Sequence, residues 1–338
     1  MQSTKKRLFY LDFIRAFATV AIIMTHYNAL FLYNVWPQTP EKAVVTLRVA
    51  NVYIGGFGVS LFLIVSGASL MYVYQDQFDA KAFYKKRFVN IFPMFWLAYF
   101  VAFAYNFYTS GGMIPQGIPK ANFLYSLFGI DMWVSCFGVR TFAIVAEWFL
   151  GLILIIYIVF PIIRWAFVNH PRILAGVAIV MYAVTLWRVN SSVTLFARLP
   201  EFLFGMYFVK YIKEVKWPVA LASLAVLVAN TLLKPGFNEM IQILYVGICS
   251  FMLLVYVSKF FQWEWFKNIC KKICKYSYAC FLIHHFVIYR VAEKFDLNSL
   301  SIAKSYALFS VVVLMITIAT VALHKTNDKI LALFKTKD

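Results

Sequence analysis

Two ionisable residues, Arg15 and His26, interrupt the first long apolar stretch of the sequence, which runs from Arg7 to Tyr33. An interval of eleven residues places them about 20° apart around a helix axis and about 16 Å apart along it. Histidine can act as a general base near neutral pH, and arginine can bind phosphate. Because ionisable groups inside a membrane span face protein or water and mark function, the pair predicts a polar site on one helix face.

A structural interpretation of the same two residues stays open at this point. Asp12 precedes Arg15 by three residues, which is close enough for a contact on one helix face. Asp12 would then anchor Arg15 near the lipid headgroups, and His26 would be a hydrogen-bonded core residue.

A carboxylate and a basic cluster are the next candidates. If a fourth span begins near Phe142 at the outer surface, Glu147 lies about 8 Å inside it, at a depth similar to that of His26. A carboxylate beside a histidine fixes its tautomer and stabilises the imidazolium, so the expected catalytic residues are His26, Arg15 and Glu147. The cluster Lys85, Lys86 and Arg87 either marks topology and lipid contact or binds the phosphates of a cytosolic cofactor.

The composition identifies the environment in which these residues act. Hydrophobic residues make up 63% of the chain, charged residues 14%, and the mean hydropathy is +0.76, whereas soluble domains have about 45–50% apolar and about 25% charged residues. The net charge of +18 comes from short basic clusters between apolar stretches. These clusters indicate membrane topology and contact with anionic lipid, and we expect no nucleic-acid partner. The five cysteines are interpreted as ordinary apolar residues, and no metal site is expected.

About ten stretches have the length and hydrophobicity of membrane spans. They cover residues 8–33, 51–75, 88–108, 142–163, 173–189, 196–213, 217–233, 240–258, 276–293 and 304–323. An even number places both termini on one side, and Lys and Arg favour that side by about two to one, which indicates N-in and C-in. The predicted fold is an all-α polytopic membrane helical bundle, with residues 1–338 as a single transmembrane domain.

Several polar or small residues inside these stretches need an explanation. The second stretch is rich in glycine and serine, which favours close helix packing. Arg198 and Glu201 are three residues apart and predict a local ion pair. His284 and His285 differ by about 100° on a helix, so only one of them should face a polar interior.

Five short patterns occur in order along the chain. The first is Arg15 and His26 with ten residues between them. The others are Phe62, Ser66 and Gly67; Arg87 and Pro93 after the basic cluster; Trp148, Phe149, Leu150, Tyr157 and Pro161; and Ser277, Tyr278, Phe281, Leu282 and His284. Together they make the chain resemble the acyltransferase family 3 integral-membrane proteins, ten-helix enzymes that O- or N-acylate extracytoplasmic glycans or small acceptors. Asn90 stands where the third pattern has a second arginine, and the fifth pattern favours His284 over His285.

The resemblance implies a membrane O-acyltransferase that uses acyl-coenzyme A, with acetyl-coenzyme A as the expected donor and no metal. His26 would be the catalytic base, and Arg15, helped by Arg87, would hold the donor. Donor binding is also expected at Lys85, Lys86, Ser66 and His284. The implied acceptor is a hydroxyl of a cell-envelope or capsular polysaccharide or of its lipid-linked precursor, reached from outside a bacterial plasma membrane. The other expected partner is the lipid bilayer, and a homo-oligomer is left open.

A transporter or flippase of lipid-linked glycans is the rival interpretation, since it also needs intramembrane charges. The sequence shows no internal repeat and no paired interrupted spans, which argues against this class. A non-catalytic scaffold would leave Arg15 and His26 without a role.

Overall fold

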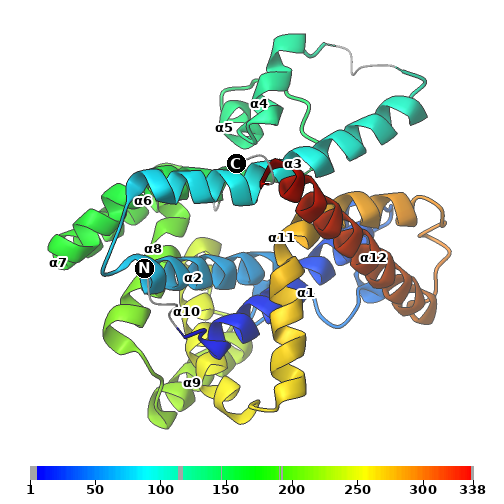
Figure 1. The fold of residues 1–338 in the computed structure, drawn as a ribbon. Coiled ribbons are helices and arrows are strands. Elements are labelled where there is room, and N and C mark those ends of the chain that lie inside the picture. Colours follow the sequence, from blue (N-terminus) through cyan, green and yellow to red (C-terminus); the bar gives the residue numbers. More distant parts are fainter. Residues whose placement is uncertain (1–5, 113–116, 146, 190, 192, 336–338) are drawn as a thin grey trace. The chain divides into compact units, whose positions relative to one another are not determined.

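The computed structural model describes residues 6–112, 117–145, 147–189, 191 and 193–335, and these fold almost wholly into helices (Figure 1). Seven of the described helices are long and apolar enough to cross a membrane. They are α1 (Phe9–Tyr33), α2 (Ile54–Tyr74), α3 (Ala80–Thr109), α6 (Glu147–Asn169), α7 (Pro171–Arg188), α10 (Glu239–Val257) and α12 (Ile302–Lys335). The predicted class, an all-α membrane helical bundle, is confirmed.

The remaining predicted stretches also coincide with helices, although these are shorter or more polar. They are α8 (Leu195–Tyr207) with the π-helical turn η3 (Phe208–Ile212), α9 (Trp217–Leu233) and α11 (Glu264–Ala292). The number of crossings and the N-in, C-in orientation stay predictions. Short elements fill the connections: η1 (Pro40–Lys42), β1 (Arg48–Val49), β2 (Val52–Tyr53), η2 (Lys120–Asn122), α4 (Phe123–Leu127), α5 (Asp131–Ser135) and η4 (Ser258–Phe260).

Helices α3, α6 and α11 begin five or more residues away from their predicted starts. Helix α3 begins at Ala80 because Asp79 caps it, with its Oδ1 atom accepting hydrogen bonds from the backbone N–H groups of Lys81 and Ala82 at 2.9 and 3.2 Å. The basic cluster therefore lies on α3 itself. Helix α6 begins at Glu147, because the backbone of Phe142 is held elsewhere: its N–H donates to Ser126 at 3.0 Å and its carbonyl accepts from Tyr99 at 2.8 Å.

The chain divides into two compact units, which are described separately below. The first unit comprises Met1–Phe78, Ile162–Ser277 and Leu300–Ser305, and the second comprises Asp79–Pro161, Tyr278–Ser299 and Tyr306–Asp338. Helices α6, α11 and α12 contribute residues to both units. Helix α2 is central to the first unit, where it packs against α1, α8 and α10.

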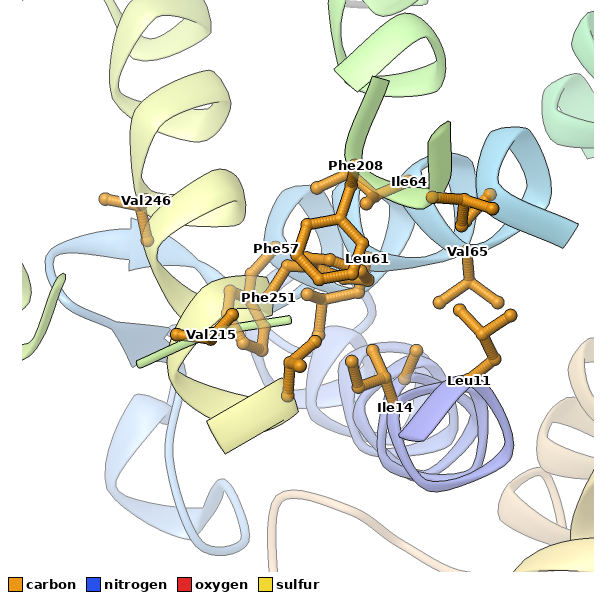
Figure 2. Close-up of a cluster of buried hydrophobic side chains, with 14 of the residues drawn as sticks. Leu11, Ile14, Phe57, Leu61, Ile64, Val65, Phe208, Val215, Val246 and Phe251 are labelled. Atoms are coloured by element: carbon orange, nitrogen blue, oxygen red, sulfur yellow. The ribbon is translucent and has the colours of Figure 1, made fainter. Parts of the chain in front are cut away.

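The core of the first unit is an apolar cluster between α1, α2, η3 and α10 (Figure 2). Leu61 of α2 and Phe251 of α10 are fully buried in it, together with Ile14 of α1. Their side chains point toward one another in Figure 2, with Phe208 of η3 above them. Burial of these large side chains holds α1 and α2 together along the N-terminal half of α1.

Glycines let α2 and α8 touch through their backbones. A Cβ atom on Gly67 would lie 1.9 Å from the carbonyl oxygen of Phe202, and one on Gly205 would lie 1.9 Å from the carbonyl oxygen of Ile64. Both distances are far below any normal contact, so these two positions tolerate no side chain. The close packing predicted for the second apolar stretch is confirmed here.

The second unit has its own core, formed by α3, the first part of α6, the last part of α11 and α12. Its buried members include Phe95 and Tyr99 of α3, Leu150 of α6, Leu282 of α11 and Leu323 of α12. Aromatic side chains of α3 and α6 pack against one another near the start of α3. The two units thus each contain the apolar core needed to position their polar residues.

Candidate active site

Arg15 and His26 lie on one continuous helix, α1, so the predicted sharing of a face applies. The Arg15 side chain is half-buried, and its Nη2 atom donates a hydrogen bond to the hydroxyl of Ser69 on α2 at 3.2 Å. Ser69 is neutral, so this bond orients the guanidinium without neutralising it. The charge of Arg15 is left for an anionic or polarised group.

Asp12 pairs with a different arginine from the one considered in the sequence. Its carboxylate accepts two hydrogen bonds from Arg7, one of them from Nη2 at 2.8 Å. Arg7 precedes the helix and can fold back over its first turn, whereas the side chain of Arg15 is directed to α2. Asp12 therefore does not serve as the anchor of Arg15 among the described contacts, and that interpretation is wrong.

The inner part of α11 completes the surroundings of Arg15 within the first unit. Cys274 donates from Sγ to the carbonyl oxygen of Asp12 at 3.1 Å. Burial raises the pKa of the Cys274 thiol to about 12, and the positive charge of Arg15 opposes that rise. The guanidinium thus lies among α1, α2 and the lysine-rich start of α11.

The stretch of α1 between Arg15 and His26 faces α2. Ile22 lies between them on nearly the same face, and its Cδ1 atom is 3.0 Å from where a Cβ atom on Gly58 would stand. Ile22 is half-buried. The absence of a side chain at Gly58 gives this segment of α1 its close approach to α2.

His26 is half-buried and lies in a turn of α1 whose other members are fixed by hydrogen bonds. Thr25 donates to the carbonyl oxygen of Ala21 at 2.9 Å. The buried Tyr27 donates to the carbonyl oxygen of Ser305 at 2.7 Å. The backbone that carries the imidazole is therefore held rigidly, as a general base requires.

Two serines of α2, Ser66 and Ser69, lie near the site, and the described contact to Arg15 is made by Ser69. Ser66, the serine of the second pattern, has no hydrogen-bond partner within the described part of the chain, and its side chain is half-buried. Ser69 lies about one turn further along α2 and binds Arg15. The predicted donor-binding role of Ser66 is untested, and Ser69 is a residue that the sequence analysis did not single out. Its only signal was its place in a stretch rich in small residues.

The basic cluster belongs to the second unit. Lys85 and Lys86 are exposed on the first turns of α3, whereas Arg87 is half-buried. The guanidinium carbon of Arg87 lies 5.3 Å from the ring centre of Phe83 and 5.4 Å from that of Tyr157 on α6. These cation–π contacts bring together the third and fourth sequence patterns.

The fifth pattern lies against the other two in the same unit. Tyr278 of α11 donates to the carbonyl oxygen of Ile91 on α3 at 3.0 Å. The rings of Phe149 on α6 and Phe281 on α11 are 5.5 Å apart. Three patterns that lie 55 (Pro93 to Trp148) and 116 (Pro161 to Ser277) residues apart along the chain therefore meet in one core.

His284 is buried, with only 3% of its surface exposed. Its Nδ1 atom lies 2.8 Å from the carbonyl oxygen of Phe281 and 3.1 Å from that of Cys280. Carbonyl oxygens only accept, so Nδ1 carries the hydrogen and Nε2 keeps the lone pair in the neutral ring. His284 thus presents Nε2 as an acceptor.

The remaining predicted residues are placed as follows. Glu147 is the first residue of α6, so the depth computed from a start near Phe142 no longer applies. The side chain of Glu147 lies outside the described residues, and its pairing with His26 stays a prediction. The predicted ion pair of Arg198 and Glu201 is confirmed: Nη1 and Oε1 are 3.1 Å apart, and the side chains are 4% and 1% exposed.

These features define a multi-pass helical membrane protein with an arginine and a histidine on one face of its first helix. A family model described as an acyltransferase domain matches residues 8–324, and the chain belongs to this acyltransferase family. The resemblance seen in the sequence is thereby confirmed. No curated protein and no solved structure gives a significant match to the chain.

Proposed function

We propose that this membrane acyltransferase moves an acyl group, acetyl in the first instance, from cytoplasmic acyl-coenzyme A to an extracytoplasmic hydroxyl. The acceptor is a cell-envelope or capsular polysaccharide or its lipid-linked precursor. The observation that carries the proposal is the placement of Arg15 and His26 on one face of the unbroken helix α1, with Arg15 oriented by Ser69. Family membership supports the reaction class.

His26 acts as the general base. Its imidazole takes the proton of the acceptor hydroxyl while the oxygen attacks the thioester carbonyl carbon. The carbon–sulfur bond then breaks, and the coenzyme A thiolate leaves and takes up the proton from the imidazolium. General-base help of this kind is typically worth about 10²–10⁴ in rate.

Arg15 holds the donor at a distance from the reacting carbonyl. The two side chains leave α1 about 16 Å apart along its axis, which is too far for both to contact the thioester. A donor long enough to bridge this spacing would pass to one side of Ile22, which packs against α2 at Gly58. Lys85 and Lys86, exposed on α3, together with Arg87, provide positive charge for the adenosine diphosphate end.

Three further residues have proposed supporting roles. Glu147 orients His26 and stabilises its protonated form. His284 accepts a hydrogen bond at Nε2 from an amide group of the donor. The Ser66 hydroxyl donates or accepts a second hydrogen bond with the donor amides. None of these roles requires a metal ion.

The test of this function is acetyl-coenzyme A turnover by purified protein in lipid nanodiscs. His26→Gln should lower kcat by about 10²–10⁴ because the general base is lost. His170→Gln is the matched control, since His170 is exposed before α7, and it should stay within about twofold of the wild type.

Near wild-type acyl transfer by His26→Gln would contradict the mechanism. Movement of a lipid-linked glycan across the bilayer without any consumption of acetyl-coenzyme A would contradict the function itself. Mass analysis of envelope glycans from cells with and without the protein would identify both the group and the acceptor.

A further inference from the structure

The C-terminal end of α1, which is predicted to lie outside, finishes in a closed turn that carries two exposed aromatic residues. The N–H of Thr39 donates to the carbonyl oxygen of Phe31 at 3.0 Å, which closes the segment between them. Tyr33, the last residue of α1, is 75% exposed, and Trp36 is 85% exposed. Tyr and Trp side chains exposed at the end of a membrane helix are typical of interfacial anchors and of ligand-binding surfaces.

Buried hydrogen bonds tie the following residues to α1. The Asn28 amide donates to the carbonyl oxygens of Val44 and Thr46 at 3.1 and 3.2 Å, and it accepts from the N–H of Val44 at 2.8 Å. Ser305, which accepts from Tyr27, donates in turn to the carbonyl oxygen of Lys42 at 2.7 Å. The segment from Tyr33 to Thr46 is therefore fixed with respect to the turn that holds His26.

Tyr33 continues the face of α1 that bears the proposed catalytic residues. It follows His26 by seven residues, which places it about 10 Å further out and about 20° away around the axis. A second tyrosine lies beside the same turn: Tyr53 donates to the carbonyl oxygen of Thr25 at 3.5 Å. Burial raises the pKa of Tyr53 to about 12, and the neighbouring Tyr33 adds to that rise.

We propose that Tyr33 and Trp36 form a carbohydrate-binding rim that stacks against a pyranose ring of the acceptor and presents one hydroxyl to His26. The C–H bonds on one face of a pyranose ring suit the negative face of an aromatic ring. The inference rests on the proposed function, because it assigns the acceptor side of the same site.

An aromatic membrane anchor is the alternative role for such residues. An anchor needs neither a fixed backbone nor alignment with a catalytic side chain. The hydrogen bond from the Thr39 N–H to the Phe31 carbonyl oxygen closes the backbone that carries Trp36, and the helical phase of Tyr33 aligns it with His26. The geometry therefore points to a substrate-binding role.

The experiment compares a sugar with a plain alcohol as acceptor. Wild type, Tyr33→Ala and Tyr33→Phe are assayed in nanodiscs with acetyl-coenzyme A and either octyl glycosides of glucose, galactose and N-acetylglucosamine or n-octanol. Tyr33→Ala should raise KM for the best glycoside about tenfold with kcat within about twofold, as expected for the loss of one stacking contact. Tyr33→Phe should behave like the wild type, and the acetyl-coenzyme A Kd and the octanol rate should not change.

Tyr108→Ala is the matched control, since Tyr108 is 81% exposed near the end of α3 that is predicted to lie outside. An unchanged glycoside KM in Tyr33→Ala would overturn the rim and leave the His26-dependent reaction standing. Equal losses of membrane-inserted protein in Tyr33→Ala and Tyr108→Ala, with no change in KM, would also overturn it and identify an anchor. Failure of the wild type to consume acetyl-coenzyme A with every acceptor would instead refute the proposed function.

Discussion

At the scale of single residues, Arg15 is distinguished by having a neutral partner. Asp12 is engaged by Arg7, and the described hydrogen bond from the Arg15 side chain goes to Ser69. Arg15 is the seventh residue of the 25-residue helix α1, and an ionised side chain inside a membrane helix carries an energetic cost. A residue that is kept at this cost without a carboxylate in hydrogen-bond contact is suited to binding an anion that arrives from outside the protein.

Replacement of Ser69 tests this role. Ser69→Ala should raise the Kd for acetyl-coenzyme A about tenfold, because a hydrogen bond to a charged group is worth about 1.5–3 kcal/mol. Titration of purified protein with the donor measures it, and Ser69→Thr, which keeps the hydroxyl, should restore binding. The exposed Ser310 of α12 offers a surface control in Ser310→Ala. An unchanged Kd for acetyl-coenzyme A in Ser69→Ala would contradict the assignment.

At the scale of elements, α2 positions the site because α1 and α8 both pack against it. The Arg15 partner lies on α2, and so does Gly58, opposite Ile22. Gly67 brings α2 into backbone contact with α8 on another side. Small residues along α2 thus set the spacing of the helices that carry the polar groups.

Addition of one methyl group to α2 should therefore disturb the first unit. Gly67→Ala places a Cβ atom 1.9 Å from the backbone oxygen of Phe202, and such overpacking typically costs about 1–3 kcal/mol or more. A lower midpoint in a detergent thermal-stability assay is expected. Gly176→Ala in α7, where nothing lies within 4 Å, should be neutral or stabilising by about 0.4–1 kcal/mol. Equal midpoints for the two variants would refute the proposed backbone contact.

At the scale of the whole molecule, the sequence patterns divide between the two units. The first and second patterns belong to the first unit. Arg15 of the first pattern binds Ser69 on α2, and α2 carries the second pattern. The third, fourth and fifth belong to the second unit. There Arg87 contacts the ring of Tyr157, and Tyr278 donates a hydrogen bond to α3. The five patterns follow one another along the chain, but they are distributed over the cores of two units.

The orientation of the chain can be tested with one natural cysteine. Cys136 is exposed and lies between α5 and α6, in the segment predicted to face outside. A membrane-impermeant maleimide added to intact cells should label the wild type, and labelling should vanish in Cys136→Ser. Labelling of Cys136 only after the membrane is opened would reverse the predicted N-in, C-in topology.

The sequence by itself determined the membrane class, the approximate positions of the long helices and the helix face that Arg15 and His26 share. These follow from local hydrophobicity and from a helical period that fixes which residues share a face. It did not determine the partner of Asp12, the start of α6 at Glu147 or the hydrogen bond between Arg15 and Ser69. Only tertiary structure decided these, because the register between two helices and the capping of their ends depend on contacts between residues far apart in the chain.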